Sequence, residues 1–205
     1  MRWFPLLPCL AVAVLLAAAS AQAQTYVFDN TTQSRTGAAT IGTGEYASFS
    51  TDAQAYTLSS LTLNMRYSGG SSGTIKVGLY AANTDNTVGG QLIQLASFAL
   101  SALTGSYANY SVTGLSTYTL AASTRYYIGL IDTGSNGRWG TDGSTAGTGV
   151  AGEYHAATPT TPLANGAMAY MMQVGVTAVV PEPASIALFG TAIAGLIAAR
   201  RRKRG

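Results

Sequence analysis

Short segments with a two-residue hydrophobic repeat, separated by turn-forming residues, constrain the fold of this chain most strongly. Hydrophobic and polar side chains alternate at 61–67 and again at 168–176. Such alternation is typical of strands that place one face against a core, and no stretch between them sustains a helical period. Further strand-like segments lie at 26–28, 45–51, 75–80, 92–98, 107–112 and 126–131. The sequence therefore predicts an all-β fold of about eight strands, an antiparallel β-sandwich of jelly-roll type.

The breaks between these segments contain residues that favour turns. Glycines cluster at 68–73, 89–90 and 133–137, and 83–86 reads Asn-Thr-Asp-Asn. Glycine adopts positive φ without strain, and Asn and Asp side chains bond to the backbone beside them. The oxygens of 83–86 could bind calcium, but the segment lacks the glycine and the bidentate glutamate of an EF-hand loop. We expect ordinary turns there, and no metal.

The N-terminal residues 1–23 have the features of a cleavable secretory signal. A basic Arg2 precedes an apolar run at 6–19, and small residues follow as far as Ala23. The chain is therefore expected to leave the cytoplasm through the Sec translocon. Its single cysteine, Cys9, would be lost with the signal, so the exported protein could form no disulfide and no cysteine-ligated zinc site.

Between the two ends, 24–179 is predicted to be one extracellular domain, which is long enough to bury a core of its own. This segment contains five Lys and Arg against seven Asp and Glu, although the whole chain has a net charge of +3. The excess of basic residues therefore comes from the termini. Because nucleic-acid binding requires a clustered basic surface, we expect no nucleic acid as a partner.

The C-terminal tail, 180–205, has three parts. A Val-Pro-Glu-Pro segment at 180–183 precedes an uncharged run at 184–199 and a basic cluster at 200–204. As a helix the run would be about 24 Å long, slightly short of a ~30 Å hydrocarbon core. Basic flanks stay cytoplasmic, so the run is predicted to be a short transmembrane helix with the domain outside the membrane. The topology residues are Arg200, Arg201, Arg202, Lys203 and Arg204.

This arrangement of Val180, Pro181, Glu182 and Pro183 before an uncharged span and a basic cluster resembles the PEP-CTERM sorting signal of Gram-negative bacterial surface proteins. The resemblance implies that exosortase recognises the tail, removes it and passes the protein to the cell surface or the exopolysaccharide matrix. The membrane would then be a transient partner, through 184–199. A plain tail anchor is the alternative, and it gives no reason for the Pro-Glu-Pro segment.

The body also resembles the choice-of-anchor domains, which are exported β domains found attached to several kinds of C-terminal anchor. Three pieces carry this resemblance: Phe28-Asp29-Asn30, then Val77-Gly78-Leu79-Tyr80 with the Gly89-Gly90 loop behind it, and Leu120-Ala121-Ala122-Ser123-Thr124-Arg125-Tyr126-Tyr127. This class implies no reaction.

Candidate catalytic residues are scarce. His155, beside Glu153 and Tyr154, is the only histidine, so a hydrolase triad would have to include it. We expect His155 to be a solvent-facing loop residue. The seven acidic residues are scattered singly, although composition alone does not exclude the carboxylate pair of a glycoside hydrolase. We expect no catalytic residues and no cofactor.

Trp139 is the most conspicuous aromatic residue of the body. It lies in 136–142 between glycines, which would leave both indole faces open to stack on a sugar. Arg138 and Asp142 would then supply polar contacts to a glycan. The alternative is that Trp139 folds back over the end of the sandwich while tyrosines line the rim of the core.

Three functions remain for a chain with these features. The first is a structural or adhesive component of the cell surface, or of the exopolysaccharide of a biofilm matrix, which needs only export, sorting and a stable sandwich. The second is a carbohydrate-binding module that uses the Trp139 loop. The third is a secreted glycan hydrolase, for which no site is evident. We expect them in that order.

Overall fold

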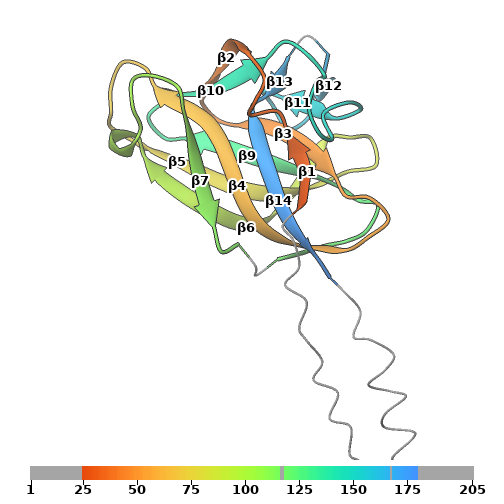
Figure 1. Cartoon of the computed structure of the whole chain (residues 1–205). Helices are drawn as coiled ribbons and strands as arrows, with labels where there is room; N and C mark the ends of the chain where they lie inside the picture. Colours follow the sequence, from red (N-terminus) through yellow and green to blue (C-terminus); the bar gives the residue numbers. More distant parts are fainter. Residues whose placement is uncertain (1–24, 116–117, 167, 180–205) are drawn as a thin grey trace, which may run out of the picture.

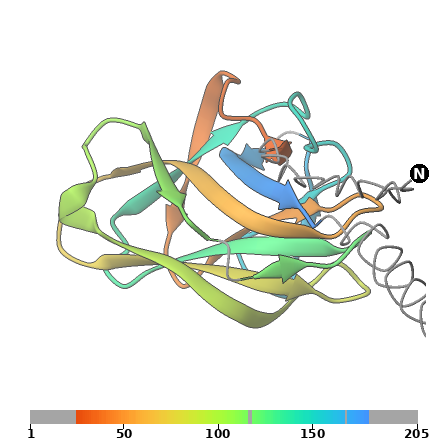
Figure 2. The same ribbon diagram turned by 60° about the horizontal axis from the view of Figure 1, so that its bottom comes forward.

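The computed structural model describes residues 25–115, 118–166 and 168–179, and their strands form two antiparallel sheets (Figure 1). The eight-stranded sheet contains β1 (Thr25–Asp29), β2 (Arg35–Ile41), β4 (Tyr56–Tyr67), β7 (Ala108–Thr113), β8 (Thr119–Leu120), β10 (Gly137–Asp142), β13 (Ala169–Tyr170) and β14 (Met172–Ala178). The six-stranded sheet contains β3 (Glu45–Ser50), β5 (Thr74–Ala82), β6 (Val88–Ala99), β9 (Arg125–Asp132), β11 (Tyr154–Ala156) and β12 (Leu163–Ala164). Figure 2 shows β4 and β14 above β9 and β6. These two sheets agree with the predicted all-β sandwich.

The order of strands in the larger sheet is β1-β14-β4-β10-β13, with β2 paired to β10 and with β7 and β8 paired to β4. The smaller sheet runs β12-β11-β3-β9-β5-β6. One 3-10 turn, η1 (Leu100–Ala102), follows β6. Among the described residues no helix is long and apolar enough to cross a membrane.

The core lies between the sheets and is built by alternating residues of each strand. On β4, Leu61, Leu63 and Met65 are fully buried, and they belong to one cluster with Ile128 and Leu130 of β9. Burying a side chain of this size contributes about 1.5–3 kcal/mol. Because successive side chains of a strand point to opposite faces, the residues between the buried ones lie on the outer face of the larger sheet.

A second, smaller cluster covers the outer face of the other sheet. Gly78 of β5 pairs with Gly129 of β9, and the rings of Tyr46 and Tyr80 meet edge to face beside this pair, 5.3 Å apart at 90°. A Cβ atom on Gly129 would lie 2.5 Å from the Tyr80 ring and 2.6 Å from the Tyr46 ring. Glycine is therefore required where these two rings cross the central strand.

The eight predicted segments all lie in strands, but their bounds differ. The segment 168–176 is divided at Met171, whose N–H donates to the Gly140 carbonyl of β10 (2.9 Å). The predicted turn at Gly89-Gly90 lies inside β6, and strands β2 and β10 were not predicted. The larger sheet is therefore wider than the sequence indicated.

Both ends of the described domain lie at one end of the sandwich (Figure 1). Thr25 of β1 pairs with Val176 of β14, and Ala178 of β14 pairs with Tyr56 at the start of β4. The predicted signal peptide at 1–23, the motif at 180–183, the helix at 184–199 and the basic residues at 200–204 lie outside the described residues.

Candidate functional site

Trp139 lies in strand β10 and not in an open loop. Its side chain is fully buried, its ring stacks on Tyr170 with centroids 4.5 Å apart, and its Nε1–H donates to the Met171 carbonyl (2.9 Å). Of the two alternatives for Trp139, the one that leaves both indole faces free is wrong, because the neighbouring glycines continue a paired strand. The indole belongs to the core, and no sugar can stack on it in this fold.

Arg138 and Asp142 do not join Trp139 in one site. Arg138 precedes Trp139 on the strand and therefore lies on the outer face of the sheet. Asp142 is buried, and its carboxylate accepts hydrogen bonds from the backbone N–H (3.2 Å) and the hydroxyl (2.9 Å) of Ser144. Asp142 therefore holds a turn.

His155 is also placed differently from the expectation. It lies in β11, it is buried, and its ring meets Tyr170 edge to face at 5.8 Å. Its Nδ1 lies 3.1 Å from Oδ1 of Asn165. The prediction of a solvent-facing loop residue is therefore wrong, and the imidazole is a packed part of the interior.

The Tyr170 hydroxyl donates a hydrogen bond to the carboxylate of Glu45 within the same region. Burial raises the pKa of the Glu45 carboxyl above its usual value, although the bond from Tyr170 acts in the opposite direction. Burial likewise raises the pKa of Tyr170. The hydroxyl therefore remains a donor at neutral pH, and it satisfies an acid that the fold has largely removed from water.

In the turn at 83–86, the oxygens of Asp85 and Asn86 accept hydrogen bonds from other groups of the protein. The carboxylate of Asp85 accepts from the N–H (3.0 Å) and the hydroxyl (2.6 Å) of Thr87, and these bonds lower the pKa of Asp85. The Asn83 amide donates to the Thr87 hydroxyl (2.9 Å). In the part of the chain that the structure describes, no three His, Cys, Asp or Glu side chains come together as a metal site would require.

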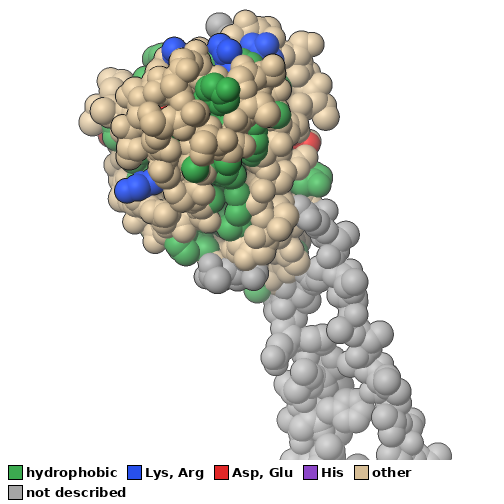
Figure 3. Space-filling model, turned by 90° about the vertical axis from the view of Figure 1, so that its left-hand side faces the viewer, with side chains coloured by type: hydrophobic (Ala, Val, Ile, Leu, Met, Phe, Trp, Pro, Cys, Tyr) green, Lys and Arg blue, Asp and Glu red, His purple; other side chains and the backbone are tan. Residues whose placement is uncertain are grey.

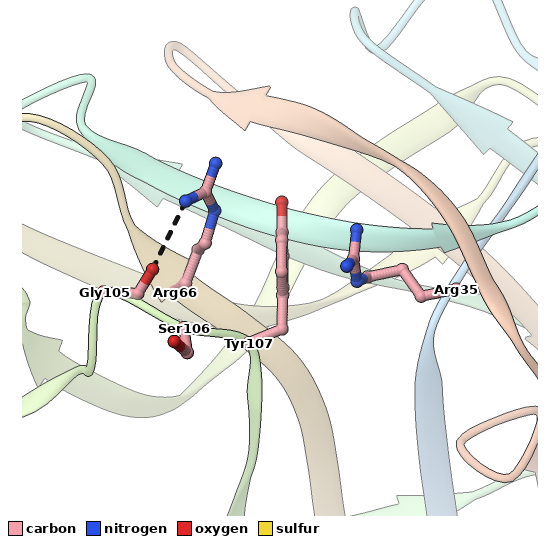
Figure 4. A pocket seen from close by; sticks show the side chains of 5 residues that line it. All are labelled: Arg35, Arg66, Gly105, Ser106 and Tyr107. Atoms are coloured by element: carbon pink, nitrogen blue, oxygen red, sulfur yellow. Dashed lines mark hydrogen bonds between the residues drawn. The ribbon is translucent and has the colours of Figure 1, made fainter.

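A pocket of about 340 Å³ lies on the outer face of the larger sheet, lined by Arg35, Arg66, Gly105, Ser106 and Tyr107 (Figure 4). Arg35 begins β2, Arg66 lies near the end of β4, and Tyr107 directly precedes β7. The Tyr107 ring lies between the two arginines, with the guanidinium carbon of Arg35 4.1 Å and that of Arg66 5.0 Å from its centroid. Stacking on one ring thus holds two cations side by side.

Two polar atoms of this pocket have no hydrogen-bond partner among the described residues, namely Nε of Arg66 and the hydroxyl of Tyr107. Both atoms are buried, and a buried polar atom without a partner costs about 1–3 kcal/mol. The Arg66 side chain donates a hydrogen bond through Nη1 to the Gly105 carbonyl (3.3 Å). Unpartnered groups of this kind call for an explanation, because most buried polar groups in proteins are satisfied.

Arg138 extends the positive charge of the pocket. In the antiparallel pair of β4 and β10, Arg138 lies directly opposite Arg66, so both side chains leave the same face of the sheet. Like charges directly opposite each other destabilise a sheet by roughly 0.2–1 kcal/mol. Within the described ranges the one salt bridge joins Arg125 to Glu153 (3.0 Å), so no carboxylate offsets this repulsion. We call Arg35, Arg66, Arg138 and Tyr107 the arginine cluster.

Sequence reasoning missed this cluster, apart from Arg138. Its residues come from three strands and one loop that are far apart in the chain. The pairing of β10 with β2 and β4, and of β4 with β7, brings them together. The one signal in the sequence was the scarcity of basic residues, since 24–179 contains only five Lys and Arg. With so few, a site that binds anions would have to use several of these five.

Comparison with known families decides the nature of the tail. Residues 179–203 match the family model described as the PEP-CTERM protein-sorting motif. The chain carries a PEP-CTERM motif. The prediction made from Pro181, Glu182 and Pro183 is thereby confirmed for the motif itself. The resemblance of the body to choice-of-anchor domains stays a prediction.

No curated protein matches the chain. Among solved structures, the chain is similar to a structure of infectious bursal disease virus, Gt strain, with 12% identity over 80% of this chain and 41% of that one, at a TM-score of 0.25. A crystal structure of a viral particle of the same virus shows 12% identity over 79% and 38%, at a TM-score of 0.22. The chain thus spans about two fifths of the length of these chains, and likeness at such TM-scores bears on neither fold nor function.

Proposed function

We propose that this chain is delivered to the surface or the exopolysaccharide matrix of a Gram-negative cell, where its sandwich has a structural or adhesive and non-enzymatic role. The match at 179–203 carries the proposal, because a PEP-CTERM motif implies processing by exosortase and export to the cell envelope or surface. The predicted secretory signal at 1–23 supports the first step of that route.

The position of the motif relative to the fold supports its removal as a unit. The match begins at Val179, and the last strand, β14, ends at Ala178. Strand β14 lies between β1 and β4, and the Val179 N–H donates to the Ala55 carbonyl (3.0 Å). Cleavage beyond this point would leave every described strand intact, so the released domain would keep its core.

Mass spectrometry of the protein at its final location tests the proposal. Replacing Pro181, Glu182 and Pro183 by alanine should leave the chain inserted in the membrane but unprocessed and absent from the matrix fraction, because the run at 184–199 and its basic flank are sufficient for insertion. The wild-type protein from the matrix should lack the peptide 184–204. If that peptide is still attached to matrix protein, the tail is a plain anchor and the proposal fails.

A matched variant separates recognition from insertion. Replacing the cations at 200–204 by serine removes the charge that sets the orientation and keeps Pro181, Glu182 and Pro183. We expect this variant to be mis-inserted or degraded, whereas the alanine variant accumulates in the membrane. Identical behaviour of the two variants would contradict a separate role for the Pro-Glu-Pro segment.

A further inference from the structure

We propose that the arginine cluster is a binding site for carboxylate groups of an acidic, uronate-containing polysaccharide. This inference rests on the proposed function and names the class of ligand that an adhesive role would require. It depends on that function only because export is what brings the protein to the polysaccharide.

The distribution of charge is the first support. The domain has more acidic than basic residues, yet three of its five cations, Arg35, Arg66 and Arg138, gather on the strands β2, β4 and β10. Figure 3 shows Lys and Arg side chains gathered mainly at the top of one face. Arg66 and Arg138 repel each other across the strand pair without a carboxylate to bridge them. An anion supplied from outside would relieve that repulsion.

Arg125 differs from Arg35 and Arg138, because its guanidinium group has hydrogen-bonding partners within the protein. Arg125 pairs with Glu153 and donates to the Gly152 carbonyl (3.0 Å). The side chains of Arg35 and Arg138 form no hydrogen bond or ion pair with any residue that the structure describes. The cluster therefore has unused donors, as expected of a site that receives its acceptor from a ligand.

The geometry at Tyr107 favours recognition through charge. Each face of its ring is occupied by a guanidinium group, so a neutral sugar cannot stack there. The same stacking holds the two cations in place and reduces the entropy lost when an anion binds. Gly140, on β10 beneath the cluster, permits this arrangement, because a Cβ there would clash with the Asn64 amide and lie 3.1 Å from Cδ of Arg35.

The chemistry of the donors selects a planar anion. A guanidinium group presents parallel N–H donors that match the two oxygens of a carboxylate. The Tyr107 hydroxyl and Nε of Arg66 form no hydrogen bond within the described residues. Binding of an anion would therefore break no existing hydrogen bond of these two groups. The pocket volume of about 340 Å³ lies within the usual range of small-ligand sites, about 300–1,000 Å³. A uronate combines that carboxylate with hydroxyl groups for the rim at Ser106.

Binding of the purified full chain, in a non-ionic detergent, to immobilised polygalacturonate tests the proposal directly. We expect Arg138→Gln to weaken binding about tenfold, which is the effect of losing one charge-assisted contact. Lys76→Gln removes the same charge on β5 of the other sheet and should change the affinity by less than about twofold. Equal losses in the two variants would mean diffuse attraction to the protein or its tail, and would overturn the site.

Competing ligands test the chemical class. Dextran sulfate, double-stranded DNA and neutral dextran are compared with polygalacturonate at the same salt concentration. The proposal requires the polyuronate to bind most tightly in the wild type and to lose this advantage in Arg138→Gln. Tighter binding of the sulfate polymer or of DNA would overturn the assignment to uronate.

Thermal melting supplies a readout that does not depend on immobilisation. Polygalacturonate should raise the Tm of the wild type and leave the Tm of Arg66→Gln/Arg138→Gln unchanged, because a ligand stabilises only a fold that binds it. Without ligand, the double variant should melt at or above the wild-type temperature, since repulsion has been removed.

Normal sorting without polyuronate binding would overturn this inference alone. Binding with failed sorting would overturn only the proposed route.

Discussion

At the scale of single residues, Glu45 gives the fold a defined dependence on pH. Burial raises the pKa of its carboxyl above the ordinary value of 4.5, so the folded chain retains this proton to a higher pH than the unfolded chain. The contribution of Glu45 to stability is therefore fully present below pH 4.5 and is lost as the pH rises through the raised pKa.

The substitution Glu45→Gln tests this linkage. It keeps an acceptor for the Tyr170 hydroxyl and removes the ionisation, so the variant should be more stable than the wild type at about pH 7 and nearly equal to it at about pH 4. Urea unfolding followed by circular dichroism at both pH values measures the difference. A stability gap that does not change between them would contradict the raised pKa.

The residue scale also shows why the composition around Trp139 suggested an open indole. Gly137 and Gly140 gave the segment the composition of a loop, but each accommodates a neighbouring side chain across the sheet. A Cβ on Gly137 would lie 2.8 Å from Ile75 and 3.1 Å from the carboxylate of Asp132. Such contacts join residues distant in sequence, so local composition could not distinguish a glycine required by packing from one that forms a loop.

At the scale of elements, the strands recognised from sequence are those with strong alternation, and β4 is the clearest example. Its pattern at 61–67 predicted the buried Leu61, Leu63 and Met65. Strand β2, which reads Arg-Thr-Gly-Ala-Ala-Thr-Ile, has small residues of weak strand propensity and is specified by its pairing with β10. The fold class followed from local pattern, whereas the arginine cluster depended on long-range pairing. The jelly-roll subclass and the domain bounds stay predictions.

Strand β9 gives a prediction at this scale. Gly129→Ala should destabilise the domain by about 1–3 kcal/mol, because the new methyl group would overlap the Tyr46 and Tyr80 rings. Gly90→Ala in β6 is the matched control, since nothing lies within 4 Å of a Cβ there. Chemical denaturation of both variants provides the measurement. Equal stability of the two would show that the rings can move aside at no cost.

At the scale of the whole molecule, the last described strand ends beside the start of β4, whereas the arginine cluster lies near the end of β4. Ala178, the last residue before the motif match, pairs with Tyr56 at the start of β4, whereas Arg66 lies near the end of the same strand. The ten residue steps from Tyr56 to Arg66, at about 3.3 Å each, separate the end of the described domain from the cluster by roughly 33 Å along β4. A chain held by its tail would therefore direct the cluster away from the membrane.

Cysteine labelling tests this orientation, because the only natural cysteine is Cys9. In a Cys9→Ser background, a single cysteine is placed either at the pocket, by Ser106→Cys, or at the exit of the chain, by Val179→Cys. The unprocessed full chain is reconstituted in liposomes and treated with a bulky, membrane-impermeant maleimide.

Val179 is 44% exposed in the domain, so in detergent both positions should react readily. In liposomes the reaction at 179 should slow several-fold while that at 106 stays unchanged, because the bilayer covers only the end of the sandwich from which the tail leaves. Slow reaction at 106 as well would mean that the domain lies with its arginine face on the membrane, and the cluster would then be exposed to polysaccharide only after the tail is removed.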